Sequence, residues 1–210
     1  MRSVVIWDFN GTIVDDTRLC FDIEMKMLER RGMYSSYTVE EYRRLFCFPV
    51  IDYYHKLGYT FEHETYREVS DEFNRYYDEQ FAECGMVPGA LEKIRESCAK
   101  GYRNVIVSAT EQMTLEDECR KLGISEYFSD LIGIDDNMAY SKTVHASRWM
   151  ETSGIDPDTC FLLGDTLHDL ETAEKLGIKD YLLVACGHQA YEVLREKTEK
   201  TVHELAEVIL

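Results

Sequence analysis

The chain has 210 residues, of which 45% are hydrophobic and 30% are charged, and this composition is typical of a soluble globular protein. Its length allows one large core domain with a smaller satellite. The net charge of −17 argues against binding to a nucleic-acid backbone, which needs clustered Lys and Arg. No apolar run approaches the ~20 residues of a membrane span, and the N-terminus lacks a signal-peptide pattern. We therefore expect a cytoplasmic protein with neither nucleic-acid nor membrane partners.

Cysteine spacing gives a prediction about the redox environment. The seven cysteines are odd in number, scattered, and never spaced as Cys-x-x-Cys. This pattern indicates reduced, mostly structural thiols and argues against a zinc site. It also favours a reducing compartment.

The first apolar run ends in an acidic residue. Residues 4–7 are too few for a helix and rich in β-branched side chains, which predicts a buried strand, and Asn10-Gly11 is a strong turn signal. Asp8 therefore lies at the carboxyl end of a strand, the edge at which open α/β sheets bind ligands. A carboxylate there can attack phosphorus or bind Mg²⁺. An ordinary turn would use similar residues, so the choice depends on the rest of the chain. Trp7 and Phe9 are expected to pack together on one face, away from Asp8.

Residues 16–83 contain helical patterns and no convincing strand. We expect helices at about 20–31, 38–45, 49–57 and 64–81, the second opened by a capping box of Thr38 and Glu41. Such a segment, inserted between a first strand and the rest of a sheet, is typical of a lid. We predict an all-helical cap at 16–83.

Strands and helices alternate in the remainder of the chain. Strands are predicted at 104–107, 131–134, 160–163 and 181–185, separated by helices at 90–100, 111–122 and 141–150 and by one ending at 176. Amphipathic helical material is expected to finish the chain. This alternation predicts an α/β fold, with a Rossmann-like parallel sheet as the core at 1–15 and 84–210.

Polar residues recur where these strands end or where the following helix begins: Asp8, Asn10, Ser108, Lys142, Asp165 and Asp169. The set fits phosphoryl chemistry, in which a carboxylate nucleophile needs a cation to offset its repulsion of an anionic phosphate. A hydroxyl and a lysine can hold the phosphate oxygens, and a second acidic loop can complete a metal site. Singly, Ser108 could be a helix cap and Lys142 a solvated side chain. Their ordered recurrence predicts one shared site.

With these residues the chain resembles the haloacid dehalogenase superfamily, in particular its phosphatases with a helical cap, of the phosphoglycolate phosphatase and β-phosphoglucomutase kind. The resemblance covers essentially the full length. The family carries Asp-x-Asp-Gly-Thr at the first strand, which is Asp-Phe-Asn-Gly-Thr at 8–12 here. Its serine or threonine at the second strand corresponds to Ser108, its lysine to Lys142, and its Gly-Asp-x-x-x-Asp to 164–169.

The resemblance implies a mechanism. Asp8 would attack the phosphorus of a small phosphorylated metabolite and become transiently phosphorylated. Mg²⁺ would bind Asp8, the backbone carbonyl of Asn10 and Asp165, with Asp169 as a ligand through water or as support. The segment 16–83 would close over the site and select the substrate. The residues implied to hold the substrate, in part through main-chain N–H groups, are Phe9, Gly11, Thr12, Ser108, Ala109 and Lys142.

One position departs from the family pattern. The family's second aspartate, which protonates the leaving oxygen and then deprotonates the attacking water, is Asn10 here. An amide keeps the backbone carbonyl for the metal but cannot carry protons at neutral pH. General acid–base catalysis contributes typically 10²–10⁴-fold, so hydrolysis of esters with poor leaving groups should be slower by about that factor.

Three interpretations follow. The one we favour is a Mg²⁺-dependent phosphatase or phosphotransferase that acts on a substrate needing little protonation, such as an acyl or enol phosphate, or that uses another proton carrier such as His168. The second is a catalytically weak or inactive protein that binds a phosphorylated metabolite as a sensor or interaction module. The third is that Asn10 deamidates or is an introduced substitution. We expect a monomer or a weak homodimer.

Overall fold

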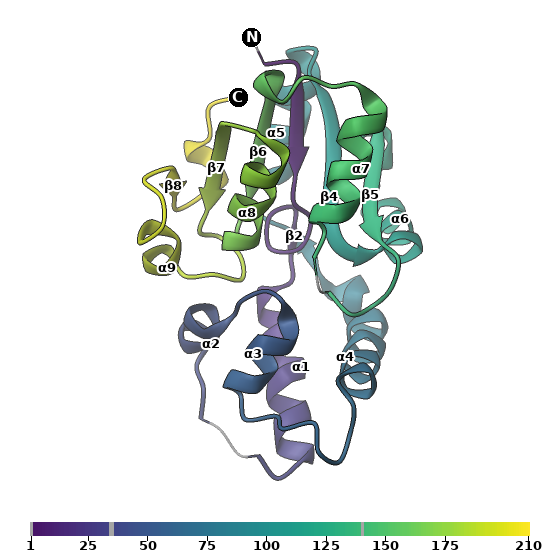
Figure 1. The fold of residues 1–210 in the computed structure, drawn as a ribbon, viewed down its shortest axis with the longest axis vertical. Helices are drawn as coiled ribbons and strands as arrows, with labels where there is room; N and C mark the ends of the chain where they lie inside the picture. The colour runs from purple at the N-terminus through teal and green to yellow at the C-terminus, as the bar shows by residue number, and fades with distance from the viewer. Residues whose placement is uncertain (1, 34–35, 140) are drawn as a thin grey trace.

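A six-stranded sheet forms the centre of the larger part of the molecule (Figure 1). The structure is a computed structural model that describes residues 2–33, 36–139 and 141–210. The strand order is β5-β4-β1-β6-β7-β8, and every neighbouring pair is parallel. The strands are β1 (Val4–Trp7), β4 (Arg103–Glu111), β5 (Asp130–Ile134), β6 (Cys160–Gly164), β7 (Asp180–Val184) and β8 (Thr201–Val202). The predicted Rossmann-like fold class is confirmed.

Alternation along the buried strands assigns their side chains to two cores. Val5 and Trp7 of β1 pack into one cluster, which also holds Phe9 as predicted, while Val4 and Ile6 pack into the other. The first cluster includes residues of α5 and α6, and the second includes residues of α7 and α8. Helices therefore cover both faces of the sheet. The helices of this part are α5 (Ala90–Ala99), α6 (Gln112–Lys121), α7 (Thr143–Ser153), α8 (Leu167–Leu176) and α9 (Tyr191–Arg195).

Four helices gather beyond the end of the sheet at which β1 finishes, and we call them the helical unit (Figure 1). They are α1 (Thr17–Arg30), α2 (Val39–Leu45), α3 (Val50–Lys56) and α4 (Tyr66–Gln80). The predicted capping box of Thr38 and Glu41 opens α2, and a second one, of Thr65 and Glu68, opens α4. Arg43 joins the helical unit to the sheet by donating to the backbone carbonyls of Ala185 and Gln189.

A two-stranded antiparallel ribbon connects the helical unit to the sheet. It pairs β2 (Val14–Asp15) with β3 (Gly85–Met86), so both crossings of the chain run side by side. These strands are too short to give a periodic pattern, and the sequence did not predict them. The ribbon lies at both ends of the segment predicted as a cap, 16–83, whose division from the core remains a prediction.

The structure differs from the sequence prediction in the C-terminal region. In place of amphipathic helical material it has the five-residue α9, the strand β8 and a 3₁₀ turn at Leu205–Glu207. Other 3₁₀ turns lie at Phe81–Glu83, Ser125–Tyr127 and Pro157–Thr159. β8 forms because β7 offers a sheet edge, whose backbone groups it pairs with. β4 also continues past the predicted end at Val107 to Glu111, with a register shift in its pairing to β5.

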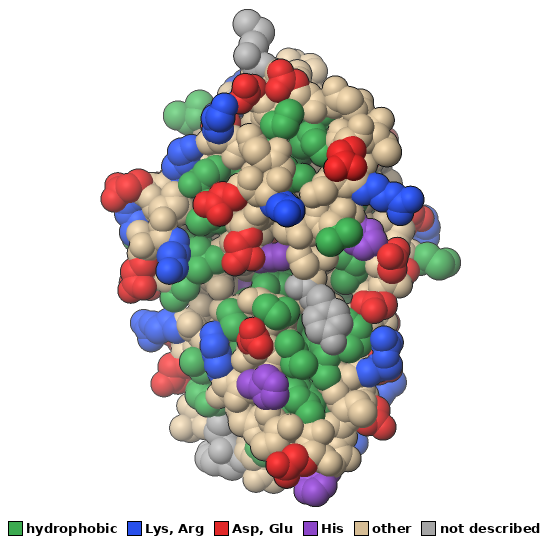
Figure 2. Space-filling view, in the orientation of Figure 1, with side chains coloured by type: hydrophobic (Ala, Val, Ile, Leu, Met, Phe, Trp, Pro, Cys, Tyr) green, Lys and Arg blue, Asp and Glu red, His purple; other side chains and the backbone are tan. Residues whose placement is uncertain are grey.

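Surface charge is mixed on the face shown in Figure 2, where acidic and basic side chains alternate over both parts of the molecule. The seven cysteines are all free thiols, as predicted. Within the described residues, none of the helices combines the length and the apolar character needed to cross a membrane.

Candidate active site

Three carboxylates meet at the carboxyl edge of the sheet. β1 and β6 are neighbours, with Trp7 opposite Leu163, so the residues that follow them, Asp8 and Asp165, come close together. Asp169, in the first turn of α8, completes the group. Oxygen atoms of the three carboxylates all lie within 4.8 Å of one another, and the side chains are almost completely buried.

One lysine contacts two of these carboxylates. Lys142 is 3% exposed, and its Nζ lies 2.5 Å from Oδ1 of Asp8 and 2.5 Å from Oδ1 of Asp169. It occupies the position before α7, where its backbone N–H donates to Nε2 of His168. Burial alone would lower the pKa of Lys142, but Asp169 and Asp8 raise it above its ordinary value. The Lys142 side chain is therefore positively charged and held between the two carboxylates.

The lysine neutralises only part of the negative charge. Burial raises the pKa of Asp8 well above its ordinary value, and the charge of Asp169 raises it further. Burial also raises the pKa of Asp165. The cluster holds three carboxylates, and Lys142 is the cation that contacts two of them, so the fully ionised cluster would carry net negative charge. Three clustered carboxylates are ligands of the kind that Mg²⁺ prefers, so the residues present fit a divalent cation.

Asp165 is held in place from several sides. Its Oδ1 accepts a hydrogen bond from Oγ1 of Thr12 at 3.0 Å, and its Oδ2 accepts one from the backbone N–H of His188 at 2.6 Å. A Cβ atom at Gly11 or Gly187 would overlap its carboxylate. Glycine is therefore required at both positions for the two loops to approach Asp165. Thr12, predicted to bind substrate, is fully buried against this carboxylate.

Ser108 and Asn10 lie in one hydrogen-bond chain. Oγ of Ser108 donates to Oγ1 of Thr110, which in turn donates to Oδ1 of Asn10 at 2.8 Å. The structure thus brings Asp8, Asn10, Ser108 and Lys142 to one cavity, which Ala109 also lines. The side chain of Phe9 lies in the core instead, so only its backbone is available to a ligand.

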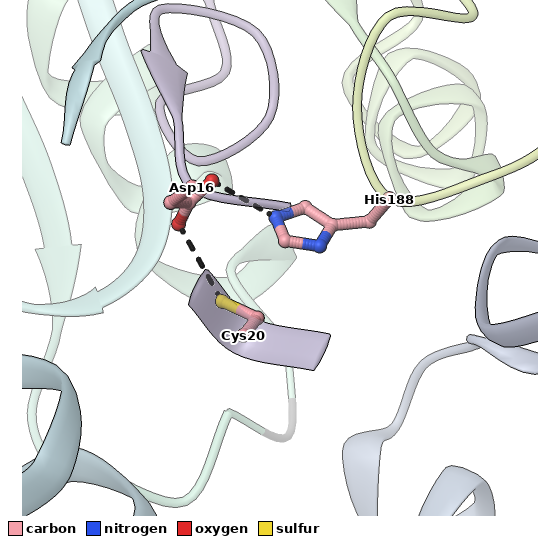
Figure 3. Close-up of side chains that lie close together, drawn as sticks. All are labelled: Asp16, Cys20 and His188. Atoms are coloured by element: carbon pink, nitrogen blue, oxygen red, sulfur yellow. Dashed lines mark hydrogen bonds and ion pairs between the residues drawn. The ribbon is translucent and has the colours of Figure 1, made fainter. Parts of the chain in front are cut away.

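Asp16 is a buried carboxylate that the sequence analysis did not single out (Figure 3). Its Oδ2 accepts hydrogen bonds from Nδ2 of Asn10 at 2.8 Å and from the Tyr77 hydroxyl at 2.7 Å. Its Oδ1 accepts from the backbone N–H of Gly11 and lies 3.2 Å from Nε2 of His188. Asn10 also donates to the Tyr77 hydroxyl. The amide of Asn10 is therefore held between Asp16 and Tyr77.

His188 forms a buried ion pair with Asp16. Burial alone would lower the pKa of His188, but the Asp16 carboxylate raises it to about 9. Burial alone would raise the pKa of Asp16, but His188 lowers it below its ordinary value. Cys20 joins the group, so that Asp16, Cys20 and His188 form a second set of possible metal donors within 4.8 Å. Burial raises the pKa of the Cys20 thiol well above its ordinary value, which favours the protonated form over a metal-binding thiolate.

His168, named above as an alternative proton carrier, is buried. It is 4% exposed and stacks on Phe48, which lies between α2 and α3, with ring centroids 4.5 Å apart. Its Nε2 accepts from the Lys142 backbone, and its Nδ1 lies 3.3 Å from Glu171. Burial lowers the pKa of His168, and the charge of Lys142 lowers it further. Both ring nitrogens are occupied, so His168 supports the Lys142 loop rather than offering a free proton carrier.

The cavity extends from Asp8 into the helical unit. Its wall there contains Glu24 of α1 and seven aromatic residues: Tyr42, Phe46, Phe48, Tyr54, Tyr66, Phe73 and Tyr77. Glu24 is 3% exposed, and its Oε2 has no hydrogen-bond partner among the described residues. Burial raises its pKa to about 8. A cavity of about 150 Å³ therefore adjoins the carboxylate cluster.

Comparison with known proteins identifies the family. Residues 5–183 match the sequence model of the haloacid dehalogenase-like hydrolase family. The chain belongs to the haloacid dehalogenase-like hydrolase family. This result confirms the predicted family and the predicted class of enzyme, a hydrolase.

Two curated relatives are distant from this chain in sequence. The pyrophosphatase PpaX from Bacillus cereus is 23% identical over 186 residues, which are 84% of this chain and 81% of that protein. A phosphoglycolate phosphatase from Vibrio vulnificus is 22% identical over 144 residues, 68% of this chain and 62% of that protein.

Solved structures of family members share the fold. A haloacid dehalogenase-like hydrolase from Bacteroides fragilis gives a TM-score of 0.84 at 18% identity, covering 100% of each chain. A family member from Streptococcus pneumoniae gives a TM-score of 0.81 at 18% identity, covering 98% of this chain and 96% of that one. At these identities the likeness establishes the fold of both parts and not the substrate.

The contact between Asn10 and Asp16 can be tested by exchanging their side chains. Asn10→Asp places a second carboxylate against Asp16 and removes the amide donor, so the free energy of unfolding should fall by about 1–3 kcal/mol. Combining Asn10→Asp with Asp16→Asn places an amide donor at position 16 opposite a carboxylate acceptor at position 10. The double variant should recover most of the lost free energy of unfolding. Urea denaturation of wild type, Asn10→Asp and the double variant at neutral pH measures both values. A double variant no more stable than Asn10→Asp would contradict the contact.

The buried acid of Glu24 predicts a pH-dependent stability. Its folded pKa of about 8 exceeds the ordinary 4.5, so the folded chain keeps a proton that the unfolded chain releases. Stability should therefore fall between pH 4.5 and 8. The advantage of Glu24→Gln should grow over the same range, to on the order of several kcal/mol. Denaturation of wild type and Glu24→Gln from pH 5 to 9 measures this, with the exposed Glu29→Gln on the same helix as control. A pH-independent difference between wild type and Glu24→Gln would contradict it.

Proposed function

We propose that the protein is a Mg²⁺-dependent phosphatase or phosphotransferase that acts on a small phosphorylated metabolite through an aspartyl phosphate at Asp8. The observation that most supports this proposal is that Asp8 belongs to the carboxylate cluster and also lines the cavity. The incompletely neutralised cluster also holds Lys142, Asp165 and Asp169, and the cavity lies beneath the helical unit. The names of the pyrophosphatase and the phosphoglycolate phosphatase support the same reaction class.

In the proposed first step, an oxygen of Asp8 forms a bond to phosphorus while the bond from phosphorus to the substrate's leaving oxygen breaks. Lys142, Ser108 and the backbone N–H groups near Phe9 and Ala109 hold the phosphoryl oxygens. Asp8, Asp165, the carbonyl of Asn10 and, indirectly, Asp169 would hold Mg²⁺, which supplies positive charge for the nucleophile and the phosphoryl group together. In the second step water attacks the phosphorus of the acylphosphate, which releases phosphate and restores the Asp8 carboxylate.

Asn10 limits both steps in this proposal. The leaving oxygen needs a proton in the first step, and the attacking water must lose one in the second. An amide held between Asp16, Tyr77 and Thr110 does neither. Substrates whose leaving groups need little protonation, such as acyl or enol phosphates, would be turned over best. The same observation favours the second candidate function, binding of a phosphorylated metabolite without turnover.

In both candidate functions, the helical unit serves as the cap that selects the ligand.

Loss of the nucleophile tests the enzymatic proposal. Wild type with Mg²⁺ should release p-nitrophenol from p-nitrophenyl phosphate, and Asp8→Asn should lower kcat by at least about 10³-fold because no covalent intermediate forms. Asp135→Asn, at an exposed position after β5, serves as the control and should keep full activity. A rate unaffected by Asp8→Asn would reject the proposed nucleophile. An inactive wild type that still binds inorganic phosphate would favour the binding function.

The leaving-group argument gives a separate prediction. Asn10→Asp combined with Asp16→Asn should raise turnover of an aliphatic phosphate ester by up to about 10²–10⁴-fold, because the ester's poor leaving group needs a proton. The gain on p-nitrophenyl phosphate should be smaller, since nitrophenolate leaves without one. Steady-state kinetics on both substrates measures the two ratios. Equal gains, or none on either ester, would contradict a proton-transfer limit at position 10.

A further inference from the structure

The cavity beneath the helical unit is lined by acids and aromatic rings. We propose that it selects phosphate esters whose alcohol carries a positively charged nitrogen, and that Glu24 is the residue that receives this nitrogen. The inference rests on the proposed function, because it assumes that the phosphoryl group lies at Asp8. It goes further by naming the chemical class of the rest of the substrate.

The distribution of charge along the cavity is the first observation. Among the described residues that line it, the cations are Lys142 and His188. Both lie near Asp8, and each is already paired with a carboxylate, Lys142 with Asp8 and Asp169 and His188 with Asp16. The lining also contains four further acids: Glu24, Asp78, Glu111 and Glu118. Lys121 acts on Asp78 and Glu118 from outside the lining. Among the described residues, the lining itself offers acids and no unpaired cation to a second anionic group of a substrate.

The burial of Glu24, which leaves one of its oxygens without a partner among the described residues, is the second observation. A carboxyl group that is 3% exposed with one oxygen unpartnered among the described residues costs free energy unless a ligand satisfies it. The charge of Arg31 acts on it, but Arg31 is already bonded to Glu64 and Glu72. Burial favours the neutral acid, and an adjacent cation would favour the carboxylate. Glu24 would therefore lose its proton when a cation binds next to it, and the resulting carboxylate would pair with that cation.

The spacing of Asp16 and Glu24 along α1 gives the approximate distance between the phosphoryl site and the proposed site for the nitrogen. Asp16, Cys20 and Glu24 follow one another at intervals of four residues, which places them along one side of α1. Asp16 contacts Asn10 next to the phosphoryl site, and Glu24 lies about 12 Å further along the helix at its Cα. Its side chain leans back towards the N-terminus and shortens this span. A short alkyl chain between phosphate and nitrogen fits the separation.

The aromatic lining is the third observation. The hydroxyl of Tyr42 is bonded to His188, that of Tyr66 to the Met138 carbonyl, and that of Tyr77 to Asp16. The hydroxyl of Tyr54 interacts with Glu24 itself. Since these hydroxyls are engaged, the tyrosines offer ring surface rather than hydrogen bonds. Ring surface around a carboxylate attracts organic cations through cation–π contacts.

The test compares two esters of the same shape and different charge. In 3,3-dimethylbutyl phosphate a carbon atom replaces the quaternary nitrogen of phosphocholine. Calorimetry with Mg²⁺ measures their binding to the full chain carrying Asp8→Asn, so that turnover does not consume the ligands. Phosphocholine should bind at least about tenfold more tightly than the neutral ester. Phosphoglycolate, with a distal carboxylate, should bind most weakly.

The variant of Glu24 decides the assignment of the residue. Adding Glu24→Gln to the Asp8→Asn chain should bring the ratio of the two affinities close to one, while adding the exposed Glu29→Gln should leave it unchanged. Equal affinities in the parent chain, no binding of either ester, or a ratio that survives Glu24→Gln would overturn the inference. Selective binding of phosphocholine by a wild-type chain that releases no phosphate would support this inference while rejecting the proposed activity.

Discussion

The rest of the site depends on a shortage of positive charge around three buried carboxylates. Lys142 reaches Asp8 and Asp169 at once, but Asp165 lies within the same cluster, and burial raises the pKa of both Asp8 and Asp165. Removing such charges from water is costly, so the arrangement persists only where the surrounding fold fixes it. The neighbouring strands β1 and β6 deliver two of the acids, and the start of α7 delivers the lysine. A divalent cation would complete the balance and leave a positive field for a phosphoryl group.

The amide of Asn10 lies in an environment that contains a buried ion pair. The carboxylate of Asp16 stands beside it, with His188 as its counter-ion. Asp16 is the N-cap residue of α1, yet its side chain makes no capping hydrogen bond to the helix, because its oxygens serve Asn10, Tyr77, Gly11 and His188 instead. Negative charge is therefore retained near the reacting group while the group that would move protons is absent. Under the mechanism proposed above, attack by Asp8 would remain possible in this environment, while proton transfer would lack a carrier at position 10.

Much of the architecture could be predicted because local patterns and topology agree. The β-branched run before Asp8, the Thr38 capping box and the alternation of strands and helices all predicted the elements that the structure has, and the parallel order brought the strand ends together. The Asp16 and His188 pair could not be predicted, since 172 positions separate its members and no local pattern marks Asp16 as a site residue. Glu24 was missed because an acid among the apolar positions of an amphipathic helix gives no sequence signal of its burial. The burial of His168 could not be predicted because Phe48, which stacks on it, is 120 positions away in the chain.

Binding of Mg²⁺ itself is the most direct test of the central claim that Asp8, Asp165 and Asp169 form an incompletely neutralised cation site. Calorimetric titration of the full chain at pH 7 should show a single Mg²⁺ site at low millimolar concentration or tighter. Asp165→Asn should abolish it while the exposed Asp135→Asn leaves it intact. A wild-type chain that binds no Mg²⁺ at such concentrations, or binding that persists in Asp165→Asn, would contradict the account.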